Sequence, residues 1–134
     1  MKKKRKPRLI RVPITQGLVD AIGQELHFGI LGLQSGDNSS DNWKRVGKVI
    51  FIVSIASDDA NNIDKKDKTA VDNAVITLEQ ISNREVDTGV WSATEIEIAA
   101  LCRGALAAES ILPHMDSRVL AKGYDAFLAL VGQP

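Results

Sequence analysis

The chain has 134 residues, close to the usual size of one domain, and 44% of them are hydrophobic, which excludes general disorder. Its 17 basic and 17 acidic residues balance, but seven of the basic ones stand within the first eleven positions, so the remainder carries a formal charge of −7. The longest apolar run, from Ala126 to Val131, has six residues and excludes a membrane span, and the single cysteine excludes an intramolecular disulfide. The basic start also lacks the apolar segment of a secretory signal.

Residues 1–12 form a predicted basic arm, extended or disordered, because Pro7 and Pro13 both oppose helix formation. Three roles are open to the arm: non-specific binding of nucleic-acid phosphates, docking on an acidic protein surface, or keeping the protein soluble. The arm has no aromatic side chain that would stack on bases, so any nucleic-acid binding should be independent of sequence. The residues expected to bind nucleic acid or a partner are Lys2, Lys3, Lys4, Arg5, Lys6, Arg8 and Arg11.

The first helix is expected to begin at Pro13 and to end at Gly36. Its apolar stripe repeats every three or four residues. Gly29, Gly32 and Gly36 lie near one side of this helix, where close approach of another backbone would offset their low helix propensity. The stripe consists of Val19, Ile22, Leu26, Gly29 and Leu33.

The second helix is expected to begin with a cap at Ser39, Ser40 or Asp41. It carries two apolar stripes, one of Trp43, Val46, Ile50 and Val53, the other of Val49, Ile52 and Ala56. Two stripes indicate a central helix, buried on most sides. The alternative for residues 49–56 is a buried strand, because the segment is rich in β-branched residues. We favour the helix, since no second strand is present in the sequence to pair with it.

A polar connection over residues 58–68 leads to a third helix that should stop at Gly89. The fourth helix is expected to open with a capping box between Ser92 and Glu95, beside a hydrophobic staple of Trp91 and Ile96.

Pro113 should break this fourth helix. The fifth helix is expected to begin near Asp116 or Ser117 and to bury Leu120, Tyr124, Phe127 and Val131. The predicted fold is therefore an all-α bundle of about five helices over residues 13–134, behind the basic arm.

The chemistry-bearing residues do not form a catalytic or metal-binding pattern. Two polar loops fail the pattern of a calcium loop. In the loop that begins at Asp37, Asn42 replaces the turn glycine and Lys48 replaces the final acid. In the loop that begins at Asp59, Ile63 stands at the fifth position and Ala70 at the twelfth. His27 and His114 stand in no metal-ligand spacing, although a site of Glu109 with His114 remains open.

Cys102 falls beside an apolar helix stripe and is expected in the core. Glu95 is assigned to the cap, and Glu97 and Glu109 to a solvated helix face. We therefore predict no cofactor, no metal and no enzymatic activity.

Several short motifs resemble a group of short proteins encoded by phages and prophages of proteobacteria. These are the Lys/Arg-rich start, Leu31-Gly32-Leu33-Gln34-Ser35-Gly36, Asp41-Asn42-Trp43, Ile81-Ser82-Asn83-Arg84, Thr88-Gly89-Val90-Trp91 and Thr94-Glu95-Ile96-Glu97. The resemblance implies an origin in a mobile element and action in the cytoplasm of a bacterial host. It implies no activity and no catalytic residues.

The leading hypothesis is a non-enzymatic accessory protein of a mobile element that binds a host or phage macromolecular assembly, as an inhibitor or a regulator. The alternative is a sequence-independent nucleic-acid-binding protein that uses the arm. Five short helices do not readily cover the apolar surface of this chain, so a homodimer or another obligate partner is also expected.

Overall fold

The computed structural model describes residues 12–36, 39–58, 60 and 62–131. They form helices α1 (Gln16–Gln34), α2 (Ser40–Asp58), α3 (Lys65–Thr88), α4 (Glu95–Ile111) and α5 (Ser117–Val131), with a 3-10 turn, η1 (Leu112–His114), between α4 and α5. Within these ranges no strand occurs beyond a single bridge between Pro13 and Asp116. The all-α bundle is therefore confirmed. None of the described helices is long and apolar enough to cross a membrane.

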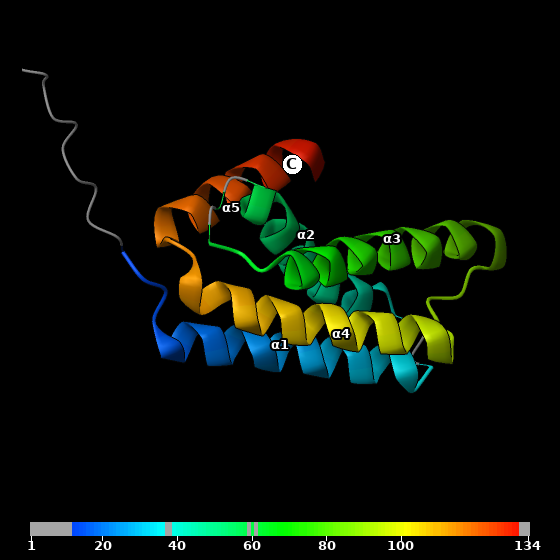
Figure 1. Cartoon of the computed structure of the whole chain (residues 1–134). Coiled ribbons are helices and arrows are strands. Elements are labelled where there is room, and N and C mark those ends of the chain that lie inside the picture. The colour runs from blue at the N-terminus through cyan, green and yellow to red at the C-terminus, as the bar shows by residue number, and fades with distance from the viewer. Residues whose placement is uncertain (1–11, 37–38, 59, 61, 132–134) are drawn as a thin grey trace, which may run out of the picture.

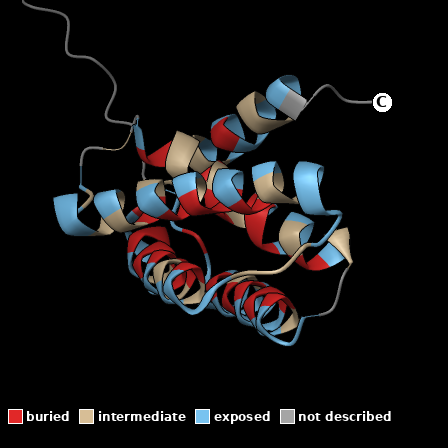
Figure 2. Cartoon of the chain, turned by 90° about the vertical axis from the view of Figure 1, so that its right-hand side faces the viewer, coloured by how far each residue is buried: buried red, intermediate tan, exposed pale blue. Residues whose placement is uncertain are grey.

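Helix α2 is the centre of the bundle, as its two apolar stripes predict. It packs against α1, α3 and α5 and also contacts α4, while α4 lies between α1 and α3 (Figure 1). Val46 and Ile50 of α2 have no exposed surface, and Val53 is 1% exposed. The buried faces of the helices point inward and their exposed faces point to solvent (Figure 2). The strand alternative for residues 49–56 is wrong, because a lone strand would have left its backbone groups unpaired.

Glycines set how closely the helices approach each other. A Cβ atom built on Gly29 would lie 2.5 Å from Cγ2 of Val46, and one on Gly32 would overlap the side chain of Asn42, so α1 and α2 meet at these glycines. The predicted approach of another backbone is confirmed at Gly29, where the Asn42 carbonyl oxygen would lie 3.2 Å from the added Cβ, whereas at Gly32 the close group is the Asn42 side chain. Gly36 has a φ of +80° and no such neighbour within 4 Å, so it serves only to end α1.

Several predicted helix boundaries are wrong by a few residues. Helix α1 begins at Gln16 rather than Pro13, because the hydroxyl of Thr15 accepts a hydrogen bond from the N–H of Leu18 at 3.2 Å. Helix α3 begins at Lys65, within the stretch predicted as a connection, with Asp64 as its cap. The predicted stop at Gly89 is confirmed by its φ of +71°.

The predicted capping box of α4 is also wrong, by two residues. Thr94 is the N-cap and Glu97, not Glu95, closes the reciprocal pair of hydrogen bonds. The predicted hydrophobic staple of Trp91 and Ile96 is also wrong, since Ile96 is 81% exposed. The register shifts because Glu97 also binds Arg84 of α3, with an Oε2–Nη2 distance of 2.5 Å, so the cap and the ion pair share one carboxylate.

Candidate functional site

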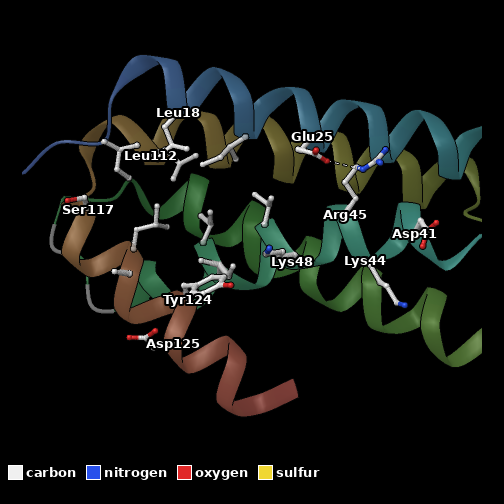
Figure 3. Close-up of a pocket in the computed structure, with 17 residues that line it drawn as sticks. Leu18, Glu25, Asp41, Lys44, Arg45, Lys48, Leu112, Ser117, Tyr124 and Asp125 are labelled. Carbon is white, nitrogen blue, oxygen red and sulfur yellow. Dashed lines mark ion pairs between the residues drawn. The ribbon is translucent and has the colours of Figure 1, made fainter. Parts of the chain in front are cut away.

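An apolar groove runs between α1, α2 and α5. Its volume is about 780 Å³. The side chains that line it project from all three helices into one hollow (Figure 3). They are Ile14, Leu18, Ile22, Glu25, Asp41, Lys44, Arg45, Lys48, Val49, Ile52, Val53, Leu112, Ser117, Leu120, Ala121, Tyr124 and Asp125.

The groove exists because α5 packs almost entirely on α2. A Cβ atom on Gly123 would lie 2.8 Å from Cβ of Ala56, so α5 is held tightly against α2 at this point. Helices α1 and α5 both pack against α2 but make no substantial packing contact with each other along the described chain. The face of α2 between them is therefore left open.

Apolar side chains of the groove remain accessible to solvent. Leu18 is 48% exposed and Tyr124 is 39% exposed, whereas Ile52 and Val53 form a buried floor. The prediction that α5 buries its apolar side is wrong for Tyr124, and Leu120 and Phe127 are only partly buried. The burial of the Val131 side chain lies outside what the structure describes. An accessible apolar hollow of this kind commonly marks a binding surface.

Charged groups line the rim of the groove at the end formed by the first half of α2. Nε of Arg45 lies 2.9 Å from Oε2 of Glu25, so this cation is neutralised across the α1–α2 contact. Nζ of Lys48 lies 5.6 Å from the centre of the Tyr124 ring, a cation–π contact that joins α2 to α5. Asp125 lies beside Tyr124 on the opposite rim (Figure 3).

At the other end of the groove, Val12 is bonded to the residues at the start of α5. The N–H of Val12, the last residue of the predicted arm, donates a hydrogen bond to Oδ2 of Asp116 at 3.1 Å, and its carbonyl accepts one from the N–H of Ser117 at 2.8 Å. Asp116 also binds the side chain of Arg118, and the hydrogen bond from that side chain is the largest cause that lowers the pKa of Asp116 far below its ordinary value. The seven basic residues predicted as the binding site all belong to residues 1–11, which lie outside the described residues.

The other residues considered for chemistry lie apart from the groove. Nε2 of His27 is 3.0 Å from Oε1 of Glu109, which ties α1 to α4, so Glu109 is not simply a solvated acid. His114 is exposed at another surface, and Cys102 is half-buried against the core rather than fully enclosed. In the part of the chain that the structure covers, no group of three or more His, Cys, Asp and Glu side chains is placed to hold a metal ion.

A smaller basic cleft of about 390 Å³ lies between α3 and α4. Sequence reasoning missed it, because its cations come from two helices and are separated by more than thirty residues in the chain. Among the described residues that line this cleft there is no carboxylate. The lining residues are Lys65, Lys66, Thr69, Ala70, Asn73, Ala100 and Arg103.

The apolar groove was likewise missed. Its residues fall within the stripes that the periodicity assigns to the core, and periodicity cannot distinguish a stripe covered by another helix from one left open. Comparison of the chain with known protein families, with curated proteins and with solved structures gave no significant match.

Proposed function

We propose that this protein is a non-enzymatic binding protein that docks on a macromolecular partner through the groove between α1, α2 and α5. The observation that carries the proposal is the open apolar face of α2, flanked by accessible Leu18 and Tyr124. Leaving apolar surface in water forgoes about 25 cal/mol per Å² of stabilisation, which a bound partner would recover.

The likeness to phage and prophage proteins gives this partner a cellular setting. On that basis we propose an accessory protein of a mobile element that binds a host or phage assembly in the bacterial cytoplasm, as an inhibitor or a regulator. Occupation of the groove by a segment of that assembly is the step by which such a protein would act. A second copy of the chain is the alternative partner.

A pair of variants on one helix tests the proposal. Leu18 lines the groove and is 48% exposed, while Phe28 is 62% exposed and does not line it. Both side chains already contact water, so Leu18→Asp and Phe28→Asp should each fold, which circular dichroism checks. The wild-type protein and the two variants are immobilised, exposed to a bacterial lysate, and the retained proteins are quantified by mass spectrometry.

We expect at least one protein that the wild type and Phe28→Asp retain equally and that Leu18→Asp retains about tenfold less. Equal retention by all three proteins would place the contact surface outside the groove. Retention lost only in Phe28→Asp would assign it to the surface of α1 around Phe28, outside the groove.

The second candidate function is sequence-independent binding of nucleic acid. Two observations favour it: the seven basic residues among the first eleven, and the cleft of Lys65, Lys66 and Arg103, whose described lining residues include no carboxylate. If the arm contacts roughly four to seven phosphates of duplex DNA, log affinity should fall with log salt at a slope of roughly −4 to −6.

Deletion of residues 1–11 separates the two basic regions. The deletion retains Val12 and its hydrogen bond to Asp116, so the fold should survive. If the deletion abolishes nucleic-acid binding equally for all sequences, the binding site is the arm. If the deleted protein still binds and the further change Lys65→Ala/Arg103→Ala abolishes that binding, the remaining site is the cleft. No binding by the intact protein at low salt would contradict this candidate.

A further inference from the structure

We infer that the occupant of the groove is an amphipathic α-helix of a partner protein that carries acidic residues along the flank facing Lys44 and Lys48. The inference rests on the proposed function, since it names what docks in the groove. It adds the secondary structure of the docking segment, the side of that segment that is charged, and the sign of the charge.

The groove follows α2 over the length of a short helix. The residues of α2 that line its floor and its charged rim run from Asp41 to Val53. At a rise of about 1.5 Å per residue, this stretch is about 18 Å long, or a little more than three turns. The lining residues on α2 recur every three or four positions. Side chains at this spacing form the ridges and grooves into which another helix can pack.

The walls of the groove belong to two different helices. Leu18 and Ile22 of α1 line one side, and Leu120 and Tyr124 of α5 line the other. Leu18 and Tyr124 are labelled in Figure 3. Since α1 and α5 do not pack substantially on each other, a helix laid over α2 would contact three helices at once. It would bury an apolar stripe in the manner of the other helices of this bundle.

A helix fits this surface better than an extended peptide or a small ligand. An extended segment needs partners for its backbone N–H and C=O groups, and the described chain offers no strand edge beside the apolar floor. A small ligand is normally enclosed over most of its surface. Here the wall residue Leu18 remains half exposed, as expected for one side of a long open trough.

The charges at the rim determine which side of the docking helix should be acidic. Lys44 and Lys48 are one turn apart on α2, and no carboxylate within the described residues forms an ion pair with either of them, whereas neighbouring Arg45 is paired with Glu25. Asp41 stands in the first turn of α2, where the positive end of the helix dipole compensates its charge. The two lysines are therefore the cations left to meet acidic residues spaced one turn apart on a partner.

Three peptides of about 18 residues test the inference. All three carry the same leucine stripe at helical spacing, and they differ only in one flank, which holds glutamate, glutamine or lysine. Each peptide is labelled with fluorescein and titrated with the full-length protein while anisotropy is followed. We expect the glutamate peptide to bind about tenfold more tightly than the lysine peptide, and the difference to shrink as salt is added.

Two variants locate the interaction. Leu18→Asp should weaken binding of all three peptides, and Phe28→Asp should leave it unchanged. Lys44→Glu/Lys48→Glu should reverse the order of affinity, so that the lysine peptide binds best. The control is Lys65→Glu/Lys66→Glu on α3, which changes the net charge by the same amount. If only Lys44→Glu/Lys48→Glu reverses the order of affinity, the acidic flank of the peptide faces Lys44 and Lys48. If the control reverses it as well, the effect comes from net charge alone.

The outcomes that overturn the inference differ from those that overturn the proposed function. Peptides that bind equally, or an order that Lys44→Glu/Lys48→Glu does not change, reject the acidic flank. No peptide binding up to about 100 µM, together with lysate partners that depend on Leu18, rejects the helix while docking in the groove stands. A dimer in sedimentation equilibrium that Leu18→Asp dissociates makes the occupant a second copy instead. Lysate partners indifferent to Leu18 reject the proposed function itself.

Discussion

Helices α4 and α5 lie on opposite sides of the central helix and are fixed in different ways. Helix α4 lies between α1 and α3, and Leu101, Ala105 and Ala108 have no exposed surface. Helix α5 packs mainly on α2, and among its residues with described burial only Gly123 is buried. Helix α4 is covered on two sides by other helices, whereas α5 is covered on one side.

The difference separates the part of the protein that holds the fold from the part that is available for binding. Small residues let α4 approach both neighbours, and most of its apolar residues are buried or partly buried in these contacts. A helix that packs on one neighbour leaves its other sides free, and the groove opens on such a side. Helix α5 can thus respond to a partner at a low cost in stability, because few of its contacts would have to change.

The largest expected effect is at the start of α4. Glu97 is buried, closes the capping box with Thr94, and binds Arg84 of α3. Glu97→Ala leaves the guanidinium without its carboxylate and removes one hydrogen bond of the cap, so it should lower the free energy of unfolding by about 3 kcal/mol in urea denaturation. The control is Glu95→Ala, two residues away and exposed, which should cost less than about 0.5 kcal/mol. Equal effects would mean that the ion pair adds nothing to the anchorage of α4.

The next test compares glycines on the two helices. A Cβ atom on Gly104 would lie 2.5 Å from Cβ of Ala74 on α3, and α4 cannot move away from α3 without pressing on α1. Gly104→Ala should therefore cost about 1–2 kcal/mol, even after the gain in helix propensity.

Gly123→Ala on α5 creates a similar clash with Ala56 but should cost about 0.5 kcal/mol or less, since α5 can shift outward. Both free energies come from urea denaturation. A cost for Gly123→Ala as large as that for Gly104→Ala would show that α5 is fixed as firmly as α4, and the contrast between the two helices would fail.

A smaller effect distinguishes the two candidate caps of α4. The hydroxyl of Thr94 accepts a hydrogen bond from the N–H of Glu97 at 3.2 Å, so Thr94→Ala should cost about 1 kcal/mol. Ser92→Ala should change the denaturation midpoint little, because Ser92 stands outside the helix and contributes only its carbonyl to Arg84. A larger loss of stability in Ser92→Ala than in Thr94→Ala would support Ser92 as the cap, as predicted from the sequence.

The sequence predicts local features of the fold well where one residue decides them. Gly89 at the end of α3 and Pro113 after α4 mark helix ends because of their own backbone restrictions. The central place of α2 also follows from its two stripes. The capping box was misplaced because two overlapping patterns, Ser92–Glu95 and Thr94–Glu97, fit the same motif. The choice between them depends on Arg84, which reaches Glu97 only in the folded protein.

The candidate site could not be predicted in the same way. Leu18 and Tyr124 belong to apolar stripes like any core residue, and their exposure follows from the placement of α1 and α5 on either side of α2. That placement depends on close approach at Gly29 and at Gly123. A glycine in the sequence indicates that another backbone can come close, but it does not say which helix will do so.

The smallest expected effect concerns the start of α5, where Asp116 anchors both Val12 and Arg118. The hydrogen bond from the Arg118 side chain, together with the backbone N–H donors, lowers the pKa of Asp116, so the folded protein keeps this carboxylate ionised at a pH where the unfolded chain takes up a proton. Its contribution to stability is therefore fully present above the unfolded pKa of about 3.9 and is lost as pH falls toward the lower folded pKa.

Replacement of Asp116 by Asn removes this dependence while it keeps a similar shape. The urea midpoint of the wild type should fall more between about pH 6 and about pH 3 than that of Asp116→Asn, so the two curves should converge in acid. The difference should be modest, because the Arg118 side chain is half exposed and solvent screens its attraction to the carboxylate. Parallel curves would mean that α5 does not depend on this anchor. The contacts of α5 with α2 would then be the part of the structure that holds one wall of the groove in place.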